Sequence, residues 1–194
     1  MNTAALLFDT GPLLLVDDAE GGIRYWPQWL APEQGDALFA QLRDGIAWHS
    51  EQRPMYDRIV DVPRLQATVA LGNDDALREL AARIAVVAPA RYSHVGLNFY
   101  RDGHDSVAMH HDRTRHLVDG APIAILSLGA PRDMLIRRQH KGARALRIAL
   151  EPGSLLVMSH ASQFTHEHGI PKTTRHADPR ISCAFRARLP VNPI

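Results

Sequence analysis

The chain has a single cysteine, Cys183, and no long apolar run, which argue against an intrachain disulfide and a membrane-spanning helix respectively. One cysteine cannot form an intrachain disulfide, which agrees with a reducing compartment. No stretch of about 18 uncharged apolar residues occurs, so no membrane-spanning helix is expected. The amino terminus also lacks a basic region followed by an apolar signal core. We therefore expect a cytoplasmic protein with no membrane partner.

Lysine is almost absent, because 20 of the 22 basic residues are arginine. The net charge of +1 hides an asymmetry: residues 1–100 hold 8 basic and 13 acidic residues, and residues 101–194 hold 14 and 8. Five basic residues lie close together in the second half, as a phosphate-binding face requires. A solvated surface hairpin explains them equally well. They are Arg137, Arg138, Lys141, Arg144 and Arg147.

We find no internal repeat, low-complexity tract or linker, and 194 residues with 45% hydrophobic composition fit one domain, 1–194. Short apolar runs in the first 29 residues, broken by Gly, Pro and Asp, indicate edge strands. Pro32 opens a predicted helix that reaches about Arg43. A second predicted helix is capped by Asn73 and stopped by Pro89. Residues 1–93 thus form an N-terminal part with both helices.

From residue 94 onward the pattern changes to short apolar segments separated by turn residues, which indicates a β-sandwich or barrel. The two helices would cover one outer face of this sheet structure. The expected fold class is therefore α+β, mainly β, with its core in residues 94–190. The seven predicted strands are HVGLNFY, VAMHH, APIAILSLG, DMLIRR, ALRIAL, SLLVMS and RISCAFRARL.

A His-x-Asp pair, His110 and Asp112, is the first candidate for a metal site. On a strand, alternate residues share a face, so these two side chains would point the same way. Chance alone gives about one such pair in this composition, and a second copy is present at His176 and Asp178. Only the first copy is followed by further histidines that could complete two imidazoles and one carboxylate, the donor set of non-haem iron(II) oxygenases. Spacing leaves the third ligand open among His160, His166, His168 and His176.

The segment RISCAFRAR places polar residues on one strand face, where two guanidiniums, those of Arg180 and Arg186, could bind an anionic cosubstrate. An edge strand with solvated arginines is the alternative. Asn98 and Tyr100 likewise share a strand face and could donate hydrogen bonds to the same anion.

Four motifs, taken in their order along the chain, resemble those of one known protein family. NFYRDGHDSVAMHHD, SLGAPRDMLIRR, GSLLVMSHASQFTHEHGIP and PRISCAFR cover most of residues 95–188 and together resemble the AlkB family of iron(II)/2-oxoglutarate dioxygenases. VPRLQATVA, at 62–70, is similar to the stretch ahead of the core in the DNA-repair members. The resemblance implies a double-stranded β-helix (jelly-roll) core with the N-terminal helices on one outer face, and a substrate-recognition lid within residues 1–93.

By this resemblance, the iron ligands are His110, Asp112 and His168. Arg180 would pair with the distal carboxylate of 2-oxoglutarate, and the cosubstrate pocket would be completed by Asn98, Tyr100, Ser182 and Arg186. Iron(II), 2-oxoglutarate and O2 are the implied cofactors. The implied activity is oxidative demethylation of N-alkylated bases, such as N1-methyladenine and N3-methylcytosine, in DNA or RNA, by a monomeric enzyme.

Three positions bear on the substrate. Thr114 stands where nucleic-acid demethylases usually place an acidic residue near the lesion, and Ser182 stands where the family commonly has Asn. The aromatic wall that repair members supply after RLQAT is missing here, so Tyr56, ahead of Arg64, is our candidate to stack on a base. Our candidates for substrate contact are thus Tyr56, Arg64 and Thr114. A protein or small-molecule substrate, and a non-catalytic nucleic-acid-binding module, are the competing hypotheses.

Overall fold

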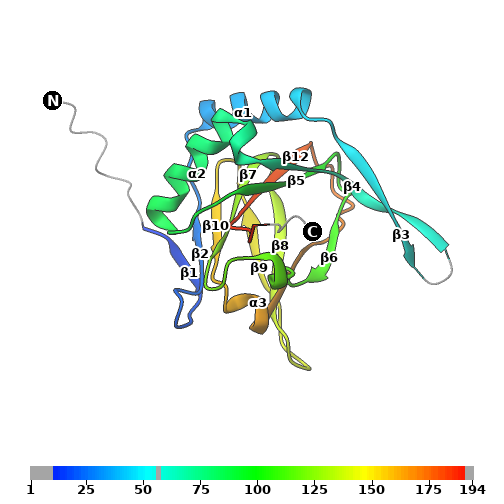
Figure 1. Ribbon diagram of the computed structural model, residues 1–194. Coiled ribbons are helices and arrows are strands. Elements are labelled where there is room, and N and C mark those ends of the chain that lie inside the picture. Colours follow the sequence, from blue (N-terminus) through cyan, green and yellow to red (C-terminus); the bar gives the residue numbers. More distant parts are fainter. Residues whose placement is uncertain (1–10, 56–57, 191–194) are drawn as a thin grey trace.

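The computed structural model describes residues 11–55 and 58–190, with side chains described outside 53–61, and consists of two antiparallel sheets (Figure 1). The larger sheet has eight strands in the order β1-β2-β10-β7-β12-β5-β4-β3, and the smaller has four in the order β6-β11-β8-β9. The strands are β1 Leu13–Val16, β2 Ile23–Trp26, β3 His49–Met55, β4 Arg58–Ala70, β5 His94–Tyr100, β6 Val107–His110, β7 Ile123–Gly129, β8 Arg132–Arg138, β9 Leu146–Leu150, β10 Leu155–Met158, β11 His166–Ile170 and β12 Arg180–Arg186.

Strand alternation divides the apolar residues between two hydrophobic clusters. On β7, Ile123 and Ile125 pack between the two sheets, against Met134 of β8, while Leu126 and Leu128 pack on the outer face of the larger sheet. The sandwich core and the core beneath the helices therefore share the same strands. This is the double-stranded β-helix architecture that the motifs predicted, and its mainly β character is confirmed.

Two helices, α1 Pro32–Gly45 and α2 Asp75–Val87, cover the outer face of the larger sheet, as predicted (Figure 1). Their buried stripes include Leu42 and Ile84. The predicted cap of the second helix is wrong by one residue. Asn73 ends a 3-10 turn, η2 Leu71–Asn73, and the side chain of Asp74 instead accepts a hydrogen bond from the Leu77 amide at 2.9 Å.

The sequence patterns missed three strands. β3 and β4 form a hairpin that projects from the body of the molecule (Figure 1), and β11 runs through the polar segment HEHGI. Pro63 interrupts the apolar pattern of β4, and two histidines obscure that of β11. β1 to β4 join the same sheet as strands beyond residue 94. The division at residue 93 and the assignment of a lid stay predictions.

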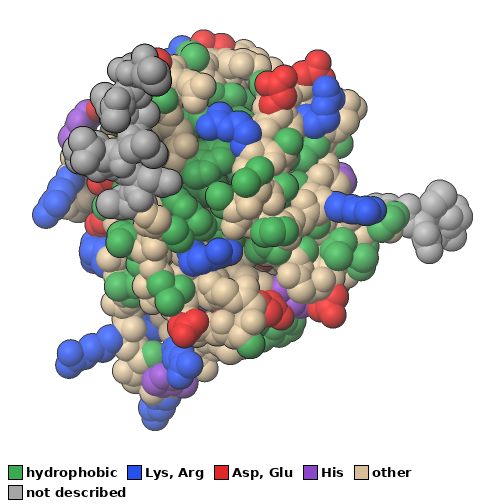
Figure 2. Space-filling view, turned by 90° about the vertical axis from the view of Figure 1, so that its left-hand side faces the viewer, with side chains coloured by type: hydrophobic (Ala, Val, Ile, Leu, Met, Phe, Trp, Pro, Cys, Tyr) green, Lys and Arg blue, Asp and Glu red, His purple; other side chains and the backbone are tan. Residues whose placement is uncertain are grey.

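The side that carries α2 and β1 is seen in Figure 2, where apolar side chains gather in a hollow with basic residues around it. A groove of about 440 Å³ lies between α2 and the start of β5. Its lining is mostly small and apolar, with Arg78 and Arg91 among its residues. In the part of the chain that the structure describes, no helix is long and apolar enough to cross a membrane.

Candidate metal and cosubstrate site

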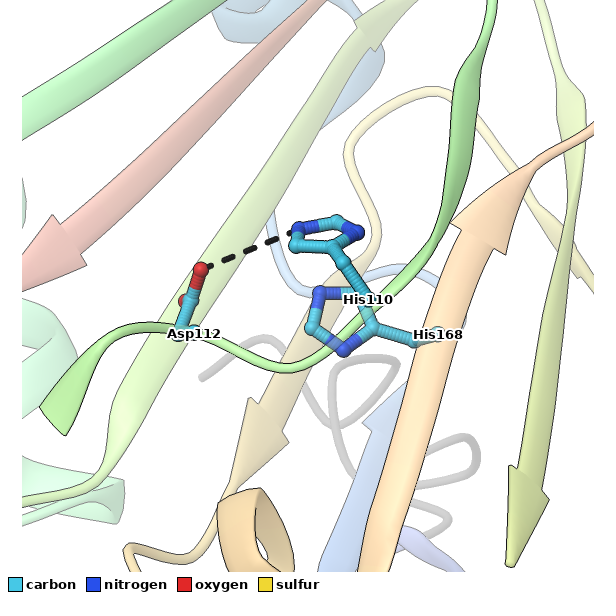
Figure 3. A group of neighbouring side chains, drawn as sticks. All are labelled: His110, Asp112 and His168. Atoms are coloured by element: carbon cyan, nitrogen blue, oxygen red, sulfur yellow. Dashed lines mark ion pairs between the residues drawn. The ribbon is translucent and has the colours of Figure 1, made fainter. Parts of the chain in front are cut away.

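Three potential metal ligands converge where β6 meets β11 (Figure 3). His110 Nε2 lies 3.8 Å from Asp112 Oδ1, and the rings of His110 and His168 have centroids 4.5 Å apart. One ligand atom from each residue lies within 4.8 Å of the others, and no other such group of His, Cys, Asp and Glu occurs among the described residues. Two imidazoles and one carboxylate fit iron(II) and leave open positions for a chelating cosubstrate.

The strand register explains why His168 joins this group. β11 pairs with β6 so that His168 stands directly opposite His110, whereas His166 stands opposite Arg138 of β8. Asp112, however, follows the last residue of β6, so our argument from strand alternation does not hold for it. The chain turns after His110, and this turn brings the Asp112 carboxylate close to the imidazole of His110.

The remaining histidine candidates make other contacts. His160 is buried with its Nδ1 atom 3.4 Å from an Asp119 oxygen. His176 and Asp178, the second His-x-Asp copy, form an exposed pair at 3.1 Å. The structure therefore brings together His110, Asp112 and His168 and leaves the other candidates apart.

Local interactions keep the three ligands in the form that binds a metal. His110 Nδ1 donates to the Ala108 carbonyl at 2.9 Å, which directs the lone pair of Nε2 toward Asp112. Burial, reinforced by nearby His110, lowers the pKa of His168 to about 4, so its imidazole is neutral at pH 7. Burial would raise the pKa of Asp112, but the positive charge of Arg186, helped by its hydrogen bond to the carboxylate and by the neighbouring imidazoles when they are protonated, outweighs it, and the net shift is downward.

Arg186 connects the metal ligands to the cosubstrate face. Its Nη2 atom donates to Asp112 Oδ2 at 2.8 Å, which leaves Oδ1 toward His110. β12 is an interior strand between β7 and β5, so the alternative of a solvated edge strand is wrong. Gly96 faces Ala184 across the β5–β12 ladder, and a Cβ atom on Gly96 would lie 2.7 Å from Arg186 Nη1. Glycine at this position thus leaves space for the guanidinium.

Arg180 lies at the opposite end of the same face and is 1% exposed. Its Nη2 atom donates to Ser127 Oγ at 3.0 Å, and its Cζ atom lies 5.1 Å from the centre of the Tyr100 ring. Arg180 Nε and Nη1 are buried with no hydrogen-bond partner among the described residues. A buried guanidinium with two unused donors fits a carboxylate, which can accept both. The site therefore suits an elongated dianion with one carboxylate at Arg180 and the other near the metal.

Ser182 and Asn98 lie between Arg180 and Arg186 on the same face of the larger sheet, and we call this row of polar residues the cosubstrate wall. Ser182 and Asn98 face each other across the β12–β5 ladder, and Tyr100 faces Arg180. Asn98 Oδ1 accepts hydrogen bonds from Arg64 Nε at 2.7 Å and Gln66 Nε2 at 3.2 Å. These bonds fix the orientation of the Asn98 amide. The five predicted cosubstrate residues thus share the inner face of the larger sheet, and their contacts with 2-oxoglutarate stay a prediction.

The three candidates for substrate contact, Arg64, Thr114 and Tyr56, lie in different surroundings or outside the described residues. Arg64 is 9% exposed and donates to Asn98 and to the Ser106 carbonyl, so it supports the cosubstrate wall. Thr114 begins a short 3-10 turn, η3 Thr114–His116, two residues beyond Asp112. Tyr56 lies outside the described residues. A substrate contact for each of the three stays a prediction.

Ser127 and Arg132 are among the supporting residues that sequence reasoning missed. Ser127 holds Arg180, and buried Arg132 donates to the backbone carbonyls of Asp102, Asp105 and Pro171 at 2.8–2.9 Å. Both lie in the motif SLGAPRDMLIRR, so their position in the resemblance was the only signal available. Their contacts are between distant segments and have no local periodicity.

Comparison with known proteins agrees with this geometry. Residues 72–188 match the family model of the 2OG-Fe(II) oxygenase superfamily. The chain is 34% identical over 123 residues to DNA oxidative demethylase ALKBH2 of Bos taurus, which covers 59% of this chain and 44% of that protein. It is 30% identical over 152 residues to alpha-ketoglutarate-dependent dioxygenase alkB homolog 3 of Mus musculus, covering 74% and 51%. The chain thus spans about half the length of these relatives.

A solved structure supports the fold. The structure of OsALKBH1 superposes with a TM-score of 0.60 at 14% sequence identity, and the match covers 86% of this chain and 97% of the other. The matched family model includes all three clustered ligands and both arginines of β12. The chain therefore belongs to the 2OG-Fe(II) oxygenase superfamily and is AlkB-like in its similarity to these relatives, and its clustered ligands fit the iron(II) of that superfamily.

Proposed function

We propose that this enzyme removes N-alkyl groups from bases in DNA or RNA, such as N1-methyladenine and N3-methylcytosine. The observation that carries the proposal is a basic hairpin, β8–β9, whose first strand pairs with β11, the strand that carries the metal ligand His168. The similarity to ALKBH2 of Bos taurus, named as a DNA oxidative demethylase, supports the same substrate class.

The basic hairpin consists of β8, β9 and the loop between them, and it projects from the body of the molecule (Figure 1). Apart from buried Arg132 at the start of β8, its five basic residues are all exposed. Arg137 pairs with Glu167 and Arg147 pairs with Asp133. Arg138, Lys141 and Arg144 have no ion-pair partner among the described residues. Three uncompensated cations on one projection suit the phosphate backbone of a nucleic acid.

The register of β8 relates this hairpin to the site. Arg138 stands opposite His166, and Ile136 stands opposite His168. Because strand residues i and i+2 share a face, Arg138 lies one step outward from the metal ligands on the inner face of the smaller sheet. A phosphate held there would place the attached nucleotide at the mouth of the site.

The residues of the site have separate tasks in the proposed reaction. His110, Asp112 and His168 would hold iron(II), and Arg180 and Arg186 would orient 2-oxoglutarate along β12. When bound with O2, this cofactor pair supplies the oxidant that converts an N-methyl group to N-hydroxymethyl, which breaks down to formaldehyde and the unmodified base. The apolar cluster between the sheets, which includes Met134 and Ile136, excludes water from the buried side.

A methylated base inside a duplex cannot reach this site. The enzyme would act on a single strand or flip the base out, at a cost of a few kcal/mol that is smallest for lesions that already weaken pairing. The β3–β4 hairpin projects beside the site-bearing strands and belongs to the segment in which we place the lid (Figure 1). Tyr56, which comes between β3 and β4 in the sequence and lies outside the described residues, is our candidate for contact with the base.

Thr114 favours a second candidate function. A hydroxyl in place of an acidic residue provides no charge to attract a cationic methylated base. A protein or small-molecule substrate would keep the iron and 2-oxoglutarate chemistry unchanged. Salt separates the two, because binding through phosphates weakens steeply with ionic strength and binding of a neutral metabolite does not.

The test is formaldehyde release from methylated single-stranded and double-stranded DNA and RNA oligonucleotides, with iron(II) and 2-oxoglutarate present. We expect release from at least one oligonucleotide and none from the His110→Ala variant. Succinate formation with other substrates, together with no turnover of any methylated oligonucleotide, would reject the proposal in favour of the second candidate.

A further inference from the structure

Asp112 is the one ligand of the group that no strand holds in place. β6 ends at His110, and the next regular element is η3, which begins at Thr114. The carboxylate of Asp112 is held by Arg186, but a carboxylate on a free loop can rotate and shift with its backbone. A separate contact on the backbone is needed to fix its position relative to the two imidazoles.

Gln163 supplies that contact. The backbone N–H of Asp112 donates to Gln163 Oε1 at 3.0 Å, across 51 positions of sequence. Gln163 lies in α3 Ser162–Thr165, the single turn that leads directly into β11 and His168. Its side chain is 2% exposed, so water does not compete for the bond. One residue thus connects the segment of the third ligand to the backbone of the second.

The amide of Gln163 is itself oriented. Its Nε2 atom lies 3.4 Å from Ser162 Oγ and 3.9 Å from Met158 Sδ, and its backbone N–H donates to the His160 carbonyl at 3.1 Å. Ser159 fixes the start of the turn, because its Oγ atom accepts from the Ser162 amide at 3.0 Å. Ser162 and Met158 therefore occupy the donor end of the amide, and Oε1 faces Asp112.

We infer that Gln163 is a positioning residue for the iron site: it acts through Asp112 and does not touch the metal. A neutral amide suits this role, since it accepts the N–H bond without adding a second negative charge beside Asp112 and Arg186. Outer contacts of this kind typically change metal affinity by about 10- to 100-fold when removed. The inference concerns metal binding alone and is independent of which substrate the enzyme uses.

The experiment compares Mn²⁺ affinity in four proteins, with Mn²⁺ as a stand-in for iron(II) that needs no protection from oxidation. Gln163→Met keeps the length of the side chain and removes the acceptor, and Gln163→Asn keeps the amide but is one methylene too short to reach Asp112. The matched control is Gln139→Ala. Gln139 Nε2 donates to the His166 carbonyl at 3.0 Å and secures the same segment, without touching Asp112.

We expect the dissociation constant for Mn²⁺, measured from the electron paramagnetic resonance signal of the free ion, to rise about 10-fold or more in both Gln163 variants. The Gln139 variant should stay within about twofold of wild type, and all metal-free proteins should melt cooperatively. Wild-type affinity in Gln163→Met overturns the inference. So does an equal loss in Gln139→Ala, which would assign the effect to loosening of α3. Should Gln163→Met not fold, Gln163→Asn decides by the same criterion.

Discussion

His168 lies directly opposite His110 across the antiparallel β11–β6 pair, and the two rings are 4.5 Å apart between centroids. His166 is also buried, shares the same strand and, two residues away, the same strand face. It faces Arg138 instead of His110. The two histidines therefore form a matched pair for testing which of them holds the metal.

We expect His168→Ala to abolish stoichiometric Mn²⁺ binding and His166→Ala to retain it within a few fold. Removal of one of three protein ligands leaves an incomplete donor set, whereas His166 contributes no ligand atom to the group. Isothermal titration calorimetry of both variants and of His110→Ala checks this. Equal loss in the two β11 variants would contradict our assignment of the third ligand.

The low pKa of His168 predicts how the metal-free protein responds to acid. An unfolded histidine takes up a proton near pH 6.5, but the folded His168 takes it up near pH 4, so the unfolded state binds more protons between these values. Stability therefore rises with pH through this window and is constant, as far as this group is concerned, above it. At pH 5 the loss is about 2 kcal/mol.

Urea unfolding of the metal-free protein at pH 5 and pH 7 measures this difference. His94 and His166 also have pKa values lowered by burial, so the total acid effect exceeds that of His168 alone. The His168→Gln variant isolates the contribution, because it should lose less stability between pH 7 and pH 5 than wild type. An identical pH dependence in the two proteins would rule out His168 as the source.

The unused donors of buried Arg180 predict that its substitution weakens the binding of 2-oxoglutarate. Substitution by Met keeps an unbranched side chain of similar length and removes the donors that Nε and Nη1 would offer to a carboxylate. We expect the dissociation constant for 2-oxoglutarate to rise about 100-fold, equivalent to about 3 kcal/mol. Arg147→Met, which removes an exposed guanidinium paired with Asp133, is the control and should leave the constant unchanged. Retained 2-oxoglutarate affinity in Arg180→Met would place the distal carboxylate elsewhere.

The basic hairpin predicts a salt effect. Replacing Arg138, Lys141 and Arg144 by Gln should weaken single-stranded DNA binding uniformly across sequences and flatten the plot of log affinity against log salt by about 2. The control replaces Arg78 and Arg91, which line the groove beside α2. Fluorescence anisotropy from 50 to 300 mM salt gives both slopes. A control that flattens the plot as much as the hairpin variant would show that binding is not localised on the hairpin.

The cosubstrate face could be predicted from sequence because it depends on a local rule. Arg180, Ser182 and Arg186 alternate with Ile181, Cys183 and Phe185, and the apolar set is fully buried in the cluster beneath the helices. The period of two therefore identified which residues share a side. It could not show that β12 is an interior strand, because that depends on pairing with β7 and β5.

The third ligand and its support depend on long-range contacts instead. His166 and His168 have equivalent spacing, and only the register of β11 against β6 distinguishes them. The strand itself was missed because histidines and a glycine give no apolar alternation. Gln163 is an ordinary polar residue in the sequence, and its contact with Asp112 spans 51 positions. Such contacts follow from the assembled sheets and have no local signature.

Because β12 is an interior strand, we expect it to tolerate substitution much less than the hairpins at the sheet edges. Its amides are hydrogen-bonded on both sides, to β7 and to β5, so they should be among the last to exchange with solvent deuterium. The β3–β4 and β8–β9 hairpins end at sheet edges. Insertions and substitutions there disturb few neighbours. We therefore expect changes in the hairpins to alter substrate preference without disturbing the proposed oxidative chemistry anchored on β12.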